Sequence, residues 1–142
     1  MTIQEIQDQI IEEFSFFESW EERYQYLIDL GKELDQNNEM EKTDAKLIVG
    51  CQSRVWLEAK IEGENLVFTA DSDAILPKGI AALLVRIYNN QPPKEILLSN
   101  TDFIEKIKLQ EFLSPTRANG LLAMIKQFKF YAIAFESKKN NA

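Results

Sequence analysis

The side chain with the most chemistry to offer is Cys51, the only cysteine in a chain of 142 residues that contains no histidine. One cysteine cannot form an intramolecular disulfide or supply the several thiolates that zinc and iron–sulfur sites need. Without histidine, Ser-His-Asp and Cys-His catalysis are both excluded. We therefore expect no resident metal or cofactor, and a nucleophile here must be activated by something other than imidazole.

Cys51 lies among small and polar residues. The segment from Gly50 to Arg54 reads Gly-Cys-Gln-Ser-Arg and joins a short apolar run to a predicted strand. A cysteine that follows a glycine at such a junction has a mobile, exposable backbone. The reactive form is the thiolate, which nearby cations favour, and Arg54 and the more distant Arg117 are the candidate cations. The alternative is that Cys51 is a small buried hydrophobe, a common fate of a free cysteine.

The composition predicts one domain over residues 1–142 with a real core, because 45% of the residues are hydrophobic. The formal net charge of −7 repels phosphate backbones and acidic membrane surfaces, so neither nucleic acid nor a membrane is an expected partner. The N-terminus lacks the basic start and apolar run of a signal peptide, and no apolar stretch is long enough to span a bilayer. We expect a cytoplasmic protein, in which a thiol stays reduced.

Helices are predicted on both sides of the cysteine segment. Apolar residues recur at helical spacing over about 3–14, 20–34, 80–88 and 115–135. Ser19 is a predicted N-cap with Glu22 completing a capping box, and Gly31 or the polar run after Leu34 should end that helix. The polar segment 35–46 is predicted to be a solvated loop, and 94–113 should hold one or two short helices.

The last predicted helix has the clearest start in the chain, because Ser114 can cap it and Pro115 fits its first position. Gly120 inside this helix costs about 1 kcal/mol relative to alanine, which indicates close packing at that point. The polar tail 137–142 is expected to be frayed.

A β-hairpin is predicted directly after the cysteine segment. Apolar residues alternate from Val55 to Ile61, residues 62–65 form a turn, and 66–70 return as a second strand. Residues 47–49 are predicted to be a short strand or the buried stem of a loop. Asp71 and Asp73 are interpreted as helix-capping residues, with Pro77 in the first turn of the helix that follows. The predicted fold is α+β, a small antiparallel sheet packed against several helices.

Four blocks of the sequence resemble one known family. Residues 50–56, Gly-Cys-Gln-Ser-Arg-Val-Trp, resemble the Gly-Cys-Gln-Ser-x-Val-Trp signature of SufE, the sulfur acceptors of iron–sulfur cluster assembly. In the same order, residues 20–24, 71–74 and 113–117 resemble the family's N-terminal helix, its hairpin-to-helix junction and the start of its last helix. The resemblance runs from about residue 20 to 124. Pro77 and the long polar loop 35–46 are the least typical features.

The resemblance implies a SufE/IscU-like fold and a specific partner, a pyridoxal-phosphate-dependent cysteine desulfurase that holds the cofactor itself. Cys51 would take a persulfide sulfur from the desulfurase, stimulate that enzyme, and pass the sulfur to an iron–sulfur scaffold complex. The cysteine loop would tuck Cys51 against apolar residues and extend it into the partner. The chain itself would be an accessory protein, a monomer or a weak homodimer, and not an independent enzyme.

The site residues implied in this way are Cys51 as the persulfide acceptor and six residues for partner binding or loop support: Gly50, Gln52, Ser53, Arg54, Asp73 and Arg117. Two other functions compete. A cluster scaffold of similar shape needs several thiolate ligands, which one cysteine cannot supply. A small protein-interaction or regulatory domain with a structural cysteine is the main alternative, and replacing Cys51 by serine separates it from a sulfur acceptor.

Overall fold

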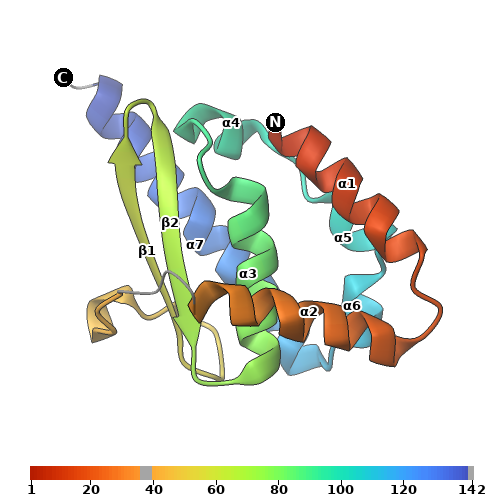
Figure 1. The fold of residues 1–142 in the computed structure, drawn as a ribbon. Coiled ribbons are helices and arrows are strands. Elements are labelled where there is room, and N and C mark those ends of the chain that lie inside the picture. Colours follow the sequence, from red (N-terminus) through yellow and green to blue (C-terminus); the bar gives the residue numbers. More distant parts are fainter. Residues whose placement is uncertain (36–39, 141–142) are drawn as a thin grey trace.

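A computed structural model describes residues 1–35 and 40–140 of the chain, arranged as one two-stranded sheet with helices (Figure 1). In chain order the elements are α1 (Ile3–Ser15), α2 (Trp20–Leu34), the short 3₁₀ helix η2 (Asp44–Lys46), β1 (Val55–Glu62), β2 (Asn65–Ser72), α3 (Ile75–Tyr88), α4 (Pro93–Leu98), α5 (Asp102–Lys106), α6 (Leu109–Phe112) and α7 (Pro115–Asn140). The predicted α+β class is confirmed. None of the described helices is long and apolar enough to cross a membrane.

The predicted hairpin is confirmed, with strands slightly longer than predicted. β1 and β2 pair antiparallel from Val55 opposite Ser72 to Glu62 opposite Asn65. Gly63 in the turn has a φ of 64°, a backbone conformation that glycine adopts at little cost. The hairpin lies beside α3 and α7, which separate it from α1 (Figure 1).

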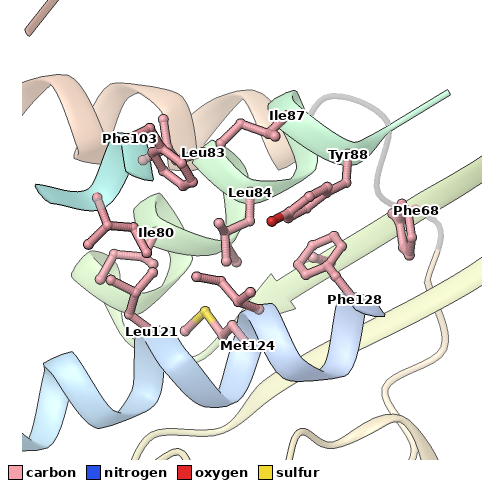
Figure 2. Packing of buried hydrophobic residues seen from close by; sticks show 14 of the residues in the cluster. Phe68, Ile80, Leu83, Leu84, Ile87, Tyr88, Phe103, Leu121, Met124 and Phe128 are labelled. Carbon is pink, nitrogen blue, oxygen red and sulfur yellow. The ribbon is translucent and has the colours of Figure 1, made fainter. Parts of the chain in front are cut away.

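The core lies between the hairpin, α3 and α7 (Figure 2). Phe128 of α7 packs against Phe68 of β2 and Tyr88 of α3, with ring centroids 4.7 Å and 5.2 Å away. Tyr131, one helical turn further on, donates a hydrogen bond from its hydroxyl to the carbonyl of Leu57 at 2.9 Å. These contacts fix α7 against β1, and they thereby fix the helix that runs beneath the cysteine segment.

The predicted helix starts are confirmed at two positions. The Ser19 hydroxyl accepts a hydrogen bond from the backbone N–H of Glu22 at 3.3 Å, and Ser114 caps α7 by accepting from Arg117 N–H at 3.3 Å. At the N-terminus, Thr2 and Glu5 form a reciprocal capping box that starts α1.

Of the two predicted ends of α2, the one after Leu34 is confirmed, and Gly31 does not end the helix. Instead it lies at the crossing of α2 and α3, where a Cβ on Gly31 would be 3.1 Å from the backbone nitrogen of Gly79. A Cβ on Gly79 would lie 2.3 Å from the carbonyl oxygen of Leu27. The two glycines therefore let the helix backbones approach each other, and this contact competes with the helix-ending role that sequence alone suggests.

The helix-capping interpretation of Asp71 and Asp73 is wrong. Asp71 lies in β2, and α3 begins at Ile75 with Ala74 at its N-cap and no side-chain capping bond. Both carboxylates have other partners, described below. Pro77 lies in the first turn of α3 as predicted.

Two further predictions differ in extent. The segment 94–113 forms three short helices and not one or two. α7 continues through Asn140, so the predicted frayed tail is helical over 137–140, while 141–142 lie outside the described residues. Of the predicted solvated loop 35–46, positions 36–39 also lie outside the described residues, and 44–46 form η2.

Candidate functional site around Cys51

Residues 49–54 form a loop, here called the cysteine loop, whose two ends are held together. The N–H of Ile48 donates to the carbonyl of Val55 at 2.8 Å, and Leu47 forms an isolated antiparallel bridge with Trp56. Residues 47 and 48 are thus the stem of the loop, one of the two predicted possibilities. Val49, the next residue, is 91% exposed. The chain leaves the core abruptly at this point.

Gly50 turns the loop back toward the molecule. Its φ of +101° is one that residues with a side chain rarely adopt. A Cβ at Gly50 would also lie 3.1 Å from the Cβ of Ala123 in α7. The dihedral angle strongly favours glycine at this position, and the close approach of Ala123 adds to that preference.

The Cys51 side chain is half-buried against α7. Its thiol donates a hydrogen bond to the carbonyl oxygen of Gly120, with Sγ and O 3.6 Å apart. A Cβ at Gly120 would lie 3.8 Å from Sγ. Gly120 therefore packs against the cysteine, but this contact leaves room for an alanine methyl group, so the packing is less tight than the sequence predicts.

Burial raises the pKa of the Cys51 thiol above its usual range. In this docked position the cysteine is held as a neutral thiol, and the hydrogen bond to Gly120 requires its proton. Neither of the candidate cations, Arg54 and Arg117, offsets this effect of burial in the docked position. A reactive thiolate requires a change in the surroundings of the sulfur.

Cys51 lies at the edge of a pocket of about 340 Å³. The pocket is lined by Cys51, Gln52, Ser53, Pro77, Ile80, Ser114, Thr116, Arg117, Gly120 and Met124. The loop, the first turns of α3 and the first turns of α7 supply these residues. The pocket thus offers apolar side chains, hydroxyl groups and one guanidinium beside a single thiol.

The structure brings only some of the predicted site residues together. Gln52, Ser53 and Arg117 line the pocket with Cys51. Arg54 and Asp73 do not line it, but they join the end of the loop to the end of β2. The Asp73 carboxylate accepts from Arg54 N–H at 3.1 Å, and the Asp73 N–H donates to the Arg54 carbonyl at 3.2 Å.

Sequence reasoning missed the wall of the pocket opposite the loop. Pro77 and Ile80 begin the apolar stripe of α3, and Met124 belongs to that of α7. Both stripes are visible in the sequence as core positions. Nothing in the sequence shows that they end beneath the cysteine, although Ser114, Thr116 and Met124 lie in or beside a block that resembles the SufE family.

Comparison with known proteins places the chain in one family. The sequence profile of SufE, described as an Fe-S metabolism associated domain, matches residues 8–132. The chain belongs to the SufE family. An uncharacterized SufE-like protein of Rhizobium meliloti is 39% identical over 127 residues, which cover 86% of this chain and 91% of that protein. Another from Rhizobium etli is 40% identical over 127 residues, with 86% of each chain covered.

The fold is shared more widely than the sequence. The solution structure of a hypothetical protein from Thermus thermophilus superposes with a TM-score of 0.75, covering 91% of this chain and 94% of that one at 21% identity. In this SufE chain the Gly-Cys-Gln-Ser-Arg-Val-Trp segment spans most of the cysteine loop and the start of β1. The part of the chain that matches the family includes the loop that carries its only cysteine.

Asp71 of β2, which lies opposite Trp56 of β1, is the centre of a cluster of ion pairs. The Asp71 carboxylate is nearly inaccessible and lies 2.7 Å from Nζ of Lys42 and 3.2 Å from Nζ of Lys78. Burial alone would raise the pKa of Asp71, but hydrogen bonds from Lys42, the Ser72 N–H and Lys78 outweigh it and lower that pKa. Lys78 also pairs with Asp35. Asp71 therefore ties the segment after α2 to the junction of β2 and α3.

Proposed function

We propose that this SufE protein is a sulfur acceptor in iron–sulfur cluster assembly, with Cys51 as the carrier of a persulfide. The donor is a cysteine desulfurase that holds a persulfide on its own cysteine, and the recipient is an iron–sulfur scaffold complex. Membership of a family associated with Fe-S metabolism supports a role in that metabolism. The position of the only cysteine, on a glycine-hinged loop at the edge of a pocket, supports the role of this residue.

The transfer step needs only the thiolate of Cys51. Its sulfur attacks the outer sulfur of the donor persulfide, a new S–S bond forms on Cys51, and the S–S bond of the donor breaks. The inner sulfur of the donor leaves as a thiolate, and the proton lost by the Cys51 thiol can return to it. No net oxidation or reduction occurs, so this chain needs no redox cofactor for the step.

The loop must have two positions for this chemistry. In the docked position the raised pKa keeps Cys51 as a thiol, which is a poor nucleophile. In an extended position the sulfur meets water or the partner, and its pKa falls toward the ordinary value. A desulfurase that binds the extended loop more tightly shifts the population toward the reactive form. After transfer, the pocket beside Cys51 can shelter the persulfide from other thiols and oxidants.

Desulfurase turnover tests this proposal. The release of alanine by the cognate desulfurase, with cysteine as substrate, is measured with and without the SufE protein. The wild-type chain should stimulate release, and the folded Cys51→Ser variant should not. Equal stimulation by both proteins would contradict the sulfur-acceptor function and favour an interaction domain with a structural cysteine.

A further inference from the structure

The contact between the cysteine loop and α7 is made by residues with little or no side chain. Gly50 and Cys51 lie on the loop side, and Gly120 and Ala123 lie one helical turn apart on α7. We call these four residues the docking seam. Building on the proposed function, we propose that Gly120 and Ala123 are positioning residues whose small size keeps Cys51 docked and so sets its reactivity.

The absence of a side chain at Gly120 leaves room for the sulfur of Cys51. A Cβ at Gly120 would have one heavy atom within 4 Å, Sγ of Cys51. This holds for the described residues, leaving out the backbone of α7 and the two chain neighbours of Gly120. A side chain at this position therefore grows toward the cysteine before it meets anything else. Alanine fits, because 3.8 Å is an ordinary van der Waals distance. A larger side chain takes the place of the docked thiol.

Ala123 controls the backbone on the other side of the sulfur. Its Cβ is the one atom within 4 Å of a Cβ position at Gly50, counted over the described residues outside the immediate chain. The methyl group of Ala123 thus lies directly under the turn of the loop. A longer side chain at 123 pushes this turn away from α7 and leaves residue 120 a glycine, which makes it a second test of the same seam.

The seam is specific for the protonated thiol. The Gly120 carbonyl oxygen can accept the S–H of Cys51, but it repels a thiolate or the negative end of a persulfide at the same distance. The cation in the lining of the pocket is Arg117, which lies on α7 and not on the cysteine loop. The raised thiol pKa agrees with this geometry. Release of the loop and ionisation of the sulfur are therefore coupled.

The rate of alkylation of Cys51 by iodoacetamide measures the docked population in the full chain. Gly120→Leu and Ala123→Leu should each raise the rate about tenfold or more, the factor that corresponds to about 1.4 kcal/mol of overpacking in the docked state. The pH at which alkylation is half-maximal should fall, because the extended sulfur has the lower pKa. Gly120→Ala should stay close to the wild-type rate.

Two controls separate loop release from general damage. Asn119→Leu adds the same side chain at the exposed neighbour of Gly120, and it should leave alkylation unchanged. Gly31→Ala crowds the crossing of α2 and α3, and it should lower the unfolding temperature without changing the alkylation rate. Circular dichroism identifies variants that fold, and if Gly120→Leu does not fold, the test rests on Ala123→Leu.

The proposal for the docking seam would be overturned if the folded leucine variants were alkylated at the wild-type rate with an unshifted pH profile. Sulfur loading by the desulfurase is then measured separately by intact mass. Fast alkylation without any sulfur loading of the wild-type chain would overturn the sulfur-acceptor function while supporting the seam. Fast alkylation with normal loading, followed by faster loss of the persulfide to added thiol, is the result expected if both proposals hold.

Discussion

The backbone N–H of Arg54 donates a hydrogen bond to the carboxylate of Asp73 at 3.1 Å, and this bond joins the last residue of the cysteine loop to the residue after β2. Replacing Asp73 by alanine removes the acceptor. We expect the free energy of unfolding to fall by about 0.5–1.5 kcal/mol. Urea denaturation measures it, and amide exchange at Arg54 should become faster.

Asp73→Asn is the matched control, because its side chain keeps an oxygen that can accept from Arg54. It should lose less stability than Asp73→Ala. Equal losses in the two variants would show that this hydrogen bond does not anchor the loop.

Gly50 gives a prediction about backbone strain. With a φ of +101° and the Ala123 methyl group at its Cβ position, alanine at Gly50 should destabilise the docked loop by about 1–3 kcal/mol. Differential scanning fluorimetry and Cys51 alkylation report the two possible responses, a lower unfolding temperature or a released loop. Gly63→Ala is the control: it has a positive φ of +64° but open space around it, so it should leave Cys51 alkylation unchanged. Equal effects of the two variants on alkylation would contradict the hinge role of Gly50.

Gly79 and Gly120 should respond to alanine with opposite signs, although both are helical. At Gly79 a Cβ collides with the Leu27 carbonyl, so Gly79→Ala should cost about 1–3 kcal/mol or more. At Gly120 the space exists, so the better helix propensity of alanine should stabilise the fold by up to about 1 kcal/mol. Urea denaturation of both variants tests this difference, and a loss of equal size at both positions would contradict it.

The ion pair of Asp71 predicts a pH dependence of stability. The folded-state pKa of Asp71 lies below its unfolded value of about 4, so the contribution is complete above that pH and is lost as the pH falls through the folded pKa. Asp71→Asn should therefore be less stable than the wild type by about 1.5–3 kcal/mol at pH 7. The gap should narrow below about pH 4.

Urea denaturation at pH 7 and below about pH 4 measures this difference in the free energy of unfolding between the wild type and Asp71→Asn. A double-mutant cycle with Lys42→Gln isolates the contribution of the pair Asp71–Lys42. A gap that is the same at both pH values would show that the charge of Asp71 does not stabilise the fold.

Much of the fold is predictable from the sequence because its signals are local. The alternation after Arg54 identifies the hairpin, and Ser19 and Ser114 mark helix starts that the structure confirms. Asp71 shows the limit. A carboxylate before a helix is chemically suited to capping, and only the tertiary positions of Lys42 and Lys78 make it a buried ion pair instead.

The candidate site, too, is predictable where its signals are local and not where it depends on tertiary contacts. The Gly-Cys junction and the family-like blocks indicate the loop, and the cost of a glycine in α7 indicates close packing at Gly120. That Cys51 is the partner of Gly120 depends on how α7 lies against β1, a contact between residues far apart in the chain. The raised pKa of the Cys51 thiol has the same origin, because the burial that causes it depends on tertiary contacts.

The most direct test of the central claim is the intact mass of the protein after incubation with cysteine and a catalytic amount of the cognate desulfurase, without added reductant. The wild-type chain should gain the mass of one sulfur atom, and a reducing agent should remove it. Cys51→Ser, shown to be folded, should gain nothing. A wild-type chain that gains no sulfur while the desulfurase turns over, or a Cys51→Ser chain that gains it, would contradict the assignment of Cys51 as the sulfur carrier.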